Sequence, residues 1–314
     1  MTPNGINATV RRSTGSTYIV RTDDGQLLEC RLRGRLRLDG SKSTNPVAVG
    51  DHVSVTTDDR GNVIAAVEQR HNCIVRRSTN LSKASHVIAA NIDQALLIAS
   101  LAHPETSTVF IDRFLASAEA FGVPTVIVFN KFDIYEQQQL DSLALLKAIY
   151  SDMGYSVLET STVSGYGIDA FKNAITGKVS AIAGNSGVGK SSLLNAVEPS
   201  LNLKTSDISL ANDSGKHTTT FAEMHHLSFG ADIIDTPGVR SYGLIDIDKE
   251  EVSHYFKDIF AVSPSCRYPN CSHTHEPGCA VISAVEEGRI ALSRYDSYLN
   301  IMTEDDEKYR QGYR

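Results

Sequence analysis

The chain has 314 residues, 41% of them hydrophobic, and no uninterrupted apolar run reaches the length of a membrane-spanning helix. The net charge of −7 argues weakly against nucleic acid as a partner, but the charge is uneven: up to Arg77, twelve Lys and Arg stand against eight Asp and Glu. Residues 1–5 lack the basic and apolar regions of a signal peptide, so we expect a cytoplasmic protein of two or three domains that does not contact a membrane.

The first 70 or so residues predict short β-strands separated by turns. The β-forming residues gather at 17–21, 27–33, 47–56 and 63–67. This pattern is typical of a compact barrel, which we place at residues 1–72. Alternating arginines, Arg31, Arg33, Arg35 and Arg37, would share one strand face. That face is either a solvated surface or a contact for the RNA backbone on an OB-like barrel.

After a mixed connector at 71–90, the pattern changes to alternating strands and helices. Buried strands are predicted at 94–100, 124–129 and 156–160, and helices at 109–121 and 137–150. This alternation predicts a parallel sheet with helices on both faces, in a domain that we place at residues 73–245.

An N-K-x-D motif, Asn130, Lys131, Phe132 and Asp133, follows the strand predicted at 124–129. Ligands bind at such strand ends in parallel sheets. The Asp133 carboxylate can accept hydrogen bonds from N1–H and the exocyclic amine of guanine, while the Asn130 amide can hold the O6/N7 side. Taken alone, the four residues also fit a turn capped by Asp133. Thr160 and Ser161, after the next strand, are placed for a backbone contact to the base.

Residues 184–191 match the phosphate-binding loop G-x-x-x-x-G-K-[ST], between an apolar run and a helical sequence. The loop and the residue after it read Gly184, Asn185, Ser186, Gly187, Val188, Gly189, Lys190, Ser191 and Ser192. Its glycines let backbone N–H groups converge on an anion. Lys190 would reach the β- and γ-phosphates, and the Ser191 hydroxyl would join the shell of Mg²⁺. The alternative is a glycine-rich turn that binds nothing.

Two later segments complete the predicted site. Asp235 opens a D-x-x-G element in which it would hold Mg²⁺ through water, while the Gly238 amide would sense the γ-phosphate. Thr219 is our choice from a threonine run that would complete the metal shell, although the run also fits a flexible loop. Val239 stands where many GTPases carry a water-positioning glutamine, so His217 is the nearest catalytic candidate, or else an exposed loop histidine.

The order of these motifs is unusual. Ordinary GTPases carry the phosphate loop before N-K-x-D, whereas here 130–133 precede 184–191, and 235–238 come last. Because pairing rather than chain order fixes strands in a sheet, joining the usual ends and opening a new gap preserves the site. The sequence therefore predicts a circularly permuted P-loop GTPase core.

Near the C-terminus, Cys266, Cys271, His273 and Cys279 form the pattern C-x₄-C-x-H-x₅-C. Three thiolates and an imidazole predict a closed tetrahedral site for one Zn²⁺, with no open position for catalysis. His275 is an alternative to His273, and a chance cluster of reduced cysteines is an alternative to a metal site. We place this α-helical zinc-binding domain at residues 246–314, where apolar residues at 292, 295, 299 and 302 predict a packing seam.

Together, these motifs in this order resemble the RsgA or YjeQ family of circularly permuted, ribosome-dependent GTPases over nearly the whole chain. The resemblance implies an N-terminal OB-fold, a GTPase core and a C-terminal zinc domain. It also implies a protein that binds the small (30S) ribosomal subunit and its rRNA late in maturation, hydrolyses GTP to GDP and phosphate when stimulated, and then departs. The matching histidine of the family is a proposed catalytic residue, so we assign catalysis to His217 and Lys190.

From this resemblance we expect a monomer that uses GTP/GDP, Mg²⁺ and one Zn²⁺. Two alternatives stay open at this point. One is an RNA-binding scaffold whose nucleotide is never turned over, and the other is a zinc hydrolase built on the cysteine cluster.

Overall fold

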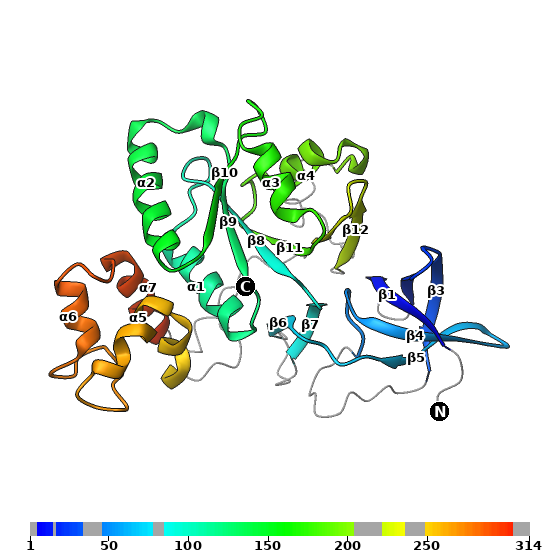
Figure 1. Cartoon of the computed structure of the whole chain (residues 1–314), viewed down its shortest axis with the longest axis horizontal. Coiled ribbons are helices and arrows are strands. Elements are labelled where there is room, and N and C mark those ends of the chain that lie inside the picture. Colours follow the sequence, from blue (N-terminus) through cyan, green and yellow to red (C-terminus); the bar gives the residue numbers. More distant parts are fainter. Residues whose placement is uncertain are drawn as a thin grey trace, which may run out of the picture.

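The computed structural model describes residues 5–14, 17–33, 46–77, 85–203, 222–235 and 249–303. A β-barrel, an α/β core and a helical C-terminal part follow one another along the chain (Figure 1). This arrangement confirms the predicted fold class. No helix in these described ranges is long and apolar enough to cross a membrane.

Five strands close the barrel. They are β1 (Ile6–Ser13), β2 (Tyr18–Thr22), β3 (Leu27–Leu32), β4 (His52–Asp58) and β5 (Gly61–Val67). The order β1-β2-β3-β5-β4 returns to β1, because β4 also pairs with β1. Alternate side chains such as Val10, Val20 and Ile64 point inward and fill the interior.

The barrel differs from the prediction in two places. β1 was not predicted, and the strand predicted at 47–56 begins only at His52. The reason for the late start is a turn at Gly50, where φ is +90° and a Cβ atom would lie 2.0 Å from the Ala90 carbonyl oxygen.

The connector between barrel and core contains a hairpin that was not predicted. Its strands, β6 (Cys73–Arg77) and β7 (Ser85–Ala90), pair antiparallel in a separate small sheet.

The core is a six-stranded part of the sheet in the order β10-β9-β8-β11-β13-β12. Its strands are β8 (Gln94–Ala99), β9 (Thr125–Phe129), β10 (Ser156–Glu159), β11 (Val179–Ala183), β12 (Glu223–Leu227) and β13 (Ala231–Asp235). All are parallel except β12. Every residue of β8 and β9 is buried, which explains their continuous apolar sequences.

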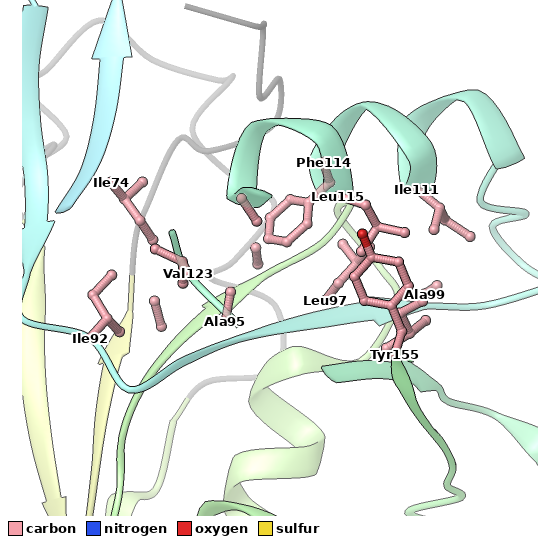
Figure 2. Close-up of a cluster of buried hydrophobic side chains, with 14 of the residues drawn as sticks. Ile74, Ile92, Ala95, Leu97, Ala99, Ile111, Phe114, Leu115, Val123 and Tyr155 are labelled. Carbon is pink, nitrogen blue, oxygen red and sulfur yellow. The ribbon is translucent and has the colours of Figure 1, made fainter. Parts of the chain in front are cut away.

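Helices cover both faces of this sheet. On one face lie α1 (Thr108–Ala120) and α2 (Gln137–Asp152), and on the other lie α3 (Ile168–Ile175) and α4 (Lys190–Val197). Figure 2 shows Ile111, Phe114 and Leu115 of α1 packed over the β8 side chains. The Ser107 hydroxyl starts α1 by accepting a hydrogen bond from the Phe110 N–H, and a capping box starts α2. Short 3₁₀ turns occupy η1 (Phe132–Ile134) and η2 (Pro199–Leu201).

The C-terminal part is helical, as predicted. It comprises η3 (Lys249–Tyr255), α5 (Lys257–Val262), η4 (Ser263–Ser265), α6 (Ala280–Glu286) and α7 (Leu292–Thr303). The predicted seam is wrong at its first residue, because Leu292 is 63% exposed. The most buried residues of α7 are Arg294, Ser297, Tyr298 and Ile301. A count of apolar residues misses this face because its largest buried side chain is a charged arginine.

Candidate functional site

The predicted motifs meet at the carboxyl edge of the parallel strands. Asn130 follows β9, Gly184 follows β11, and Asp235 ends β13. β8 and β11 are neighbours, and the chain leaves them toward opposite faces of the sheet, through α1 and α4. Such a reversal opens a crevice outside the strand ends, where ligands bind in open α/β sheets.

The side-chain amide of Asn130 connects three loops at this edge. Its Nδ2 donates to the Val188 carbonyl of the phosphate loop at 2.9 Å, and its Oδ1 accepts from the Thr160 hydroxyl at 3.0 Å. Both Asn130 and Thr160 are buried. The two motifs, separated in the sequence, are therefore parts of one site, and Asn130 is bonded to protein at both ends of its amide.

Glycines shape the phosphate loop. At Gly184, where φ is +139°, a Cβ atom would lie 2.2 Å from the Ile98 carbonyl oxygen. At Gly189, where φ is +96°, it would lie 2.4 Å from Asn130 Nδ2. These glycines therefore let the loop approach β8 and Asn130. Of the remaining loop residues, Asn185 and Ser186 are half-buried, Gly187 is exposed, Val188 is buried, and Ser192 lies in the first turn of α4.

Lys190 and Ser191 face the inside of this loop. Lys190 Nζ donates to the carbonyls of Gly184 and Asn185, both at 2.7 Å, which holds the ammonium across the loop. The Ser191 hydroxyl is buried and has no hydrogen-bond partner within the part of the chain that the structure describes. An unsatisfied buried hydroxyl costs about 1–3 kcal/mol. A divalent cation with an oxygen shell would satisfy it, so Ser191 fits the predicted role toward Mg²⁺.

Asp235 lies on the strand next to the phosphate loop. It is paired with Ile182 of β11, two residues before Gly184. The structure therefore places Asp235, as predicted, at the same edge as Lys190 and Ser191. The predicted residues His217, Thr219 and Gly238 lie outside the described residues, as do Arg35 and Arg37 of the basic barrel stretch.

A residue of the loop after β10 donates a hydrogen bond to the side chain of Asp133, which itself lies in η1 after β9. The Ser161 hydroxyl donates to Asp133 Oδ1 and accepts from the N–H groups of Val163 and Ser164, at 3.2 and 3.1 Å. The Phe132 N–H donates to the Thr160 carbonyl at 3.0 Å. Thr160 and Ser161 were expected to offer backbone contacts to a base. In the structure their side chains orient Asn130 and Asp133, while the Asp133 side chain itself is exposed.

Lys131 is fixed by a residue that sequence reasoning missed. Its backbone is left-handed, with φ of +67°, and its Nζ donates to the His103 carbonyl in the loop after β8. Burial lowers the pKa of Lys131 below its ordinary value. No motif marks His103, because the contact depends only on where the β8–α1 loop lies.

Two tyrosines near the motif were also missed. The Tyr135 hydroxyl donates to the Asn130 carbonyl at 2.7 Å and accepts from the Leu101 N–H at 2.9 Å. The Tyr166 ring stacks on Phe132 at 4.8 Å between centroids. Tyr135 lies only two residues after Asp133 and is buried, and a buried tyrosine hydroxyl usually finds a hydrogen-bond partner.

The four predicted metal ligands converge in the C-terminal part. Their ligand atoms all lie within 4.8 Å of one another. Cys266 Sγ lies 3.5 Å from His273 Nδ1 and 3.9 Å from Cys279 Sγ, and Cys279 Sγ lies 3.6 Å from His273 Nδ1. A tetrahedron with Zn–S of about 2.3 Å and Zn–N of about 2.0 Å separates its ligands by about 3.5–3.8 Å. Three of the ligands therefore lie at about the spacing of a Zn²⁺ tetrahedron, with Cys271 within 4.8 Å of them. The exposed His275, bonded to the Thr274 hydroxyl, is not part of the cluster.

The loop around this cluster is held by its own hydrogen bonds. The hydroxyls of Tyr295 and Tyr298 donate to the carbonyls of His273 and Ser272, at 2.8 and 2.7 Å. The Glu276 carboxylate accepts from the Ser272 N–H at 2.7 Å. Burial acts to raise the pKa of Glu276, but the hydrogen bonds from Ser272 outweigh it and lower that pKa. Such supporting contacts orient metal ligands.

Two family models match the chain. The model described as RsgA GTPase matches residues 67–245, and the model described as RsgA N-terminal domain matches residues 7–64. The chain is 50% identical over 306 residues to the small ribosomal subunit biogenesis GTPase RsgA 2 of Bacteroides thetaiotaomicron, which covers 97% of this chain and 99% of that protein. It is 48% identical to the RsgA of Flavobacterium psychrophilum, over 96% of this chain and 94% of that one.

Two solved structures share the fold. YjeQ from Thermotoga maritima matches with a TM-score of 0.76 and 35% identity, over 99% of this chain and 100% of that one. YloQ, described as a circularly permuted GTPase, matches with a TM-score of 0.74 and 30% identity, over 98% of this chain and 96% of that one.

Proposed function

This chain belongs to the RsgA GTPase family of circularly permuted P-loop GTP hydrolases, and from that membership we propose that it hydrolyses GTP to GDP and phosphate on the maturing small ribosomal subunit. The observation that carries the site assignment is the Asn130 amide, which joins the N-K-x-D motif to the phosphate loop. The names of the relatives, small ribosomal subunit biogenesis GTPases, support the partner. We further propose a monomer that acts in the cytoplasm.

The guanine base is assigned to Asp133. Its carboxylate accepts from N1–H and the exocyclic amine, two donors that adenine does not present together. Ser161 holds one carboxylate oxygen, so the side chain is oriented before the base arrives. Asn130 keeps the base loop at a fixed distance from the phosphate loop, and the backbone at Thr160 and Ser161 borders the base.

The phosphates are assigned to residues 184–192. Backbone N–H groups of the loop and the first turn of α4 face the anion, and Lys190 exchanges its two carbonyl partners for the β- and γ-phosphates. Ser191, Thr219 and Asp235 would hold Mg²⁺, which supplies charge neutralisation when bound. The Gly238 amide would sense the γ-phosphate. His217 would orient the attacking water, because Val239 has no polar atom for that task.

We assign three domains to these tasks: residues 1–72 contact rRNA, residues 73–245 hydrolyse GTP, and residues 246–314 form the zinc-binding domain. One arginine of the basic stretch, Arg31, is paired with Asp58 at the surface of the barrel. The Cys₃His cluster supports a structural Zn²⁺, since all four positions of a tetrahedron are filled by protein ligands.

Phosphate release with and without purified small ribosomal subunits tests this function. We expect slow release from the chain alone and a rise with subunit concentration, because the site lacks a glutamine beside its D-x-x-G element. ATP should neither compete with GTP nor be hydrolysed. A rate that stays flat across subunit concentrations would reject the partner. GTP binding without multiple turnover would instead favour the RNA-binding scaffold.

The role of His217 needs a separate measurement. His217→Ala should lower the stimulated turnover while leaving the affinity for GTP unchanged, because an imidazole that orients water does not hold the nucleotide. His275→Ala, at an exposed histidine of the C-terminal part, is the matched control. An unchanged turnover in His217→Ala would make it an ordinary loop histidine.

A further inference from the structure

Besides the contact of Val49 with Ala89, the barrel joins the core at the hairpin formed by β12 and β13. Arg12 of β1 pairs antiparallel with Glu223 of β12, so barrel and core form one eleven-stranded sheet. Glu223 is paired with Asp235 of β13, and Asp235 with Ile182 of β11. One row of paired residues thus runs from the barrel to the strand that carries the phosphate loop. Adjacent strands lie about 4.8 Å apart, so only about 10 Å of sheet separates Arg12 from Asp235.

A side-chain contact strengthens the same junction. The Arg11 guanidinium forms an ion pair with Asp232 of β13, with side chains 13% and 21% exposed. His226 Nδ1 of β12 lies 3.0 Å from the same Asp232 carboxylate. A partly exposed pair such as this one is screened less by salt than a fully exposed pair. The barrel is therefore held to both strands of the hairpin.

The turn of this hairpin is anchored to the core. The Ser228 N–H donates to Glu198 Oε2 at 2.8 Å, and the Gly177 N–H donates to the Gly230 carbonyl at 3.0 Å. At the opposite end, the chain enters β12 four residues after Thr219 and leaves β13 three residues before Gly238. The two segments assigned to Mg²⁺ and the γ-phosphate are thus covalently continuous with the end of the hairpin that is paired to the barrel.

We propose that the β12–β13 hairpin transmits the nucleotide state to the barrel. A change of nucleotide and Mg²⁺ at Asp235, which ends β13, shifts the open end of the hairpin about its anchored turn. The Arg12–Glu223 pairing and the Arg11–Asp232 ion pair carry that shift into β1. This regulation rests on the proposed function, because the barrel is the part assigned to rRNA.

Linkage gives the coupling a second consequence. If GTP strengthens the hold of the barrel on rRNA by some factor, rRNA strengthens GTP binding by the same factor, and such factors are typically about 5- to 150-fold. Variants that break the junction between the barrel and the hairpin should bring both factors closer to one, the value at which neither ligand changes the affinity for the other.

Hydrogen–deuterium exchange on the full chain tests the coupling without any ribosomal subunit. Exchange of β1 and of β12–β13 is compared between GDP and a non-hydrolysable GTP analogue. In the natural chain we expect both regions to differ between the two nucleotides. In Arg11→Met and in Asp232→Asn, the difference should persist in β12–β13 and become clearly smaller in β1, because only the Arg12–Glu223 backbone pairing then remains to carry it.

Two matched variants control this experiment. Arg31→Met breaks the Arg31–Asp58 pair, which lies entirely within the barrel, and should keep the nucleotide difference in β1. Arg11→Lys retains a cation at this position and should keep most of the nucleotide difference in the exchange of β1. Asp232→Asn leaves every barrel residue natural, so it gives a result even if Arg11→Met disturbs the barrel.

A β1 difference of natural size in Asp232→Asn would overturn the coupling, and so would a natural chain whose β1 exchanges identically with both nucleotides. Either result alongside phosphate release that subunits still stimulate would reject the coupling and retain the function. Loss of stimulation in the natural chain would reject the function itself.

Discussion

The core holds its two neighbouring parts in different ways. The barrel meets the β12–β13 hairpin through one backbone pairing and a partly exposed ion pair, and it also meets β7 where Val49 pairs with Ala89. The C-terminal helices pack on α1 through an apolar cluster that includes Ala116, with a fully buried arginine between them. The first junction borders strands that end at the nucleotide site, whereas the second lies on a helix of the outer layer. We infer that the C-terminal part moves with α1 and that the barrel follows the hairpin.

Arg294 is the centre of the C-terminal junction. Its guanidinium lies 2.7 Å from Asp112 of α1 and 3.0 Å from Asp258 of α5, and the Tyr150 hydroxyl of α2 donates to Asp112 at 2.9 Å. Burial acts to lower the pKa of Arg294, but the carboxylates of Asp112 and Asp258 outweigh it and raise that pKa. The arginine therefore stays charged and joins three helices.

The largest expected effect is that of removing the metal. Structural Zn²⁺ contributes about 10–16 kcal/mol of apparent binding free energy in small zinc domains, so Cys279→Ser should lose the metal and unfold much of the C-terminal part. Zinc content and the exchange rates of α6 and α7 measure this. Cys73→Ser in the β6–β7 hairpin is the control and should keep one Zn²⁺. A metal-free natural chain with protected α6 and α7 would contradict the zinc assignment.

Next in size is the loss of the buried arginine. Arg294→Met leaves the buried Asp112 and the partly buried Asp258 without their arginine partner, so unfolding free energy should fall by about 3–5 kcal/mol in urea titrations. Arg289→Met, which removes an exposed pair with Glu287, should cost less than about 0.5 kcal/mol. Equal urea midpoints of unfolding for Arg294→Met and Arg289→Met would show that the C-terminal junction does not depend on Arg294.

The barrel junction should be weaker. A double-mutant cycle on Arg11→Met and Asp232→Asn should give a coupling of about 1 kcal/mol or less, since the pair is partly exposed. Urea unfolding of the natural chain, both single variants and the double variant supplies the cycle. A coupling free energy as large as the loss of unfolding free energy in Arg294→Met would show that the two junctions do not differ in strength.

The smallest effect concerns the anchored turn. Hydrogen bonds from the Ser200 hydroxyl, and then from Ser228, lower the pKa of Glu198 to about 2. A carboxyl with a lowered folded-state pKa stabilises the fold above its unfolded-state pKa of about 4.5, and this contribution is lost as the pH falls toward 2. The stability difference between the natural chain and Glu198→Gln should therefore be larger at pH 7 than at pH 3. A difference independent of pH would show that Glu198 does not hold the turn as an anion.

The features that could be predicted from the sequence are those that depend on residues close together in the chain. Three motifs are each encoded within a short stretch of sequence: the phosphate loop, the N-K-x-D motif and the Cys₃His spacing. The buried strands β8 and β9 could be predicted from their continuous apolar sequences. Arg294 was missed because its partner Asp112 lies 182 positions away. The Asn130 bridge was missed for the same reason, since Val188 reaches it only through the folded sheet. Long-range polar pairs leave no periodic pattern in a single chain.

The central claim is that motifs out of their usual order surround one guanine nucleotide, and nucleotide selectivity of Asp133→Asn tests it most directly. An amide in place of the carboxylate can donate to the 2-oxo group of xanthine, so the variant should prefer XTP and lose GTP affinity by about a hundredfold or more. Asp169→Asn, at the start of α3, should keep the natural preference. An Asp133→Asn variant that still prefers GTP to XTP, as the natural chain does, would contradict the account.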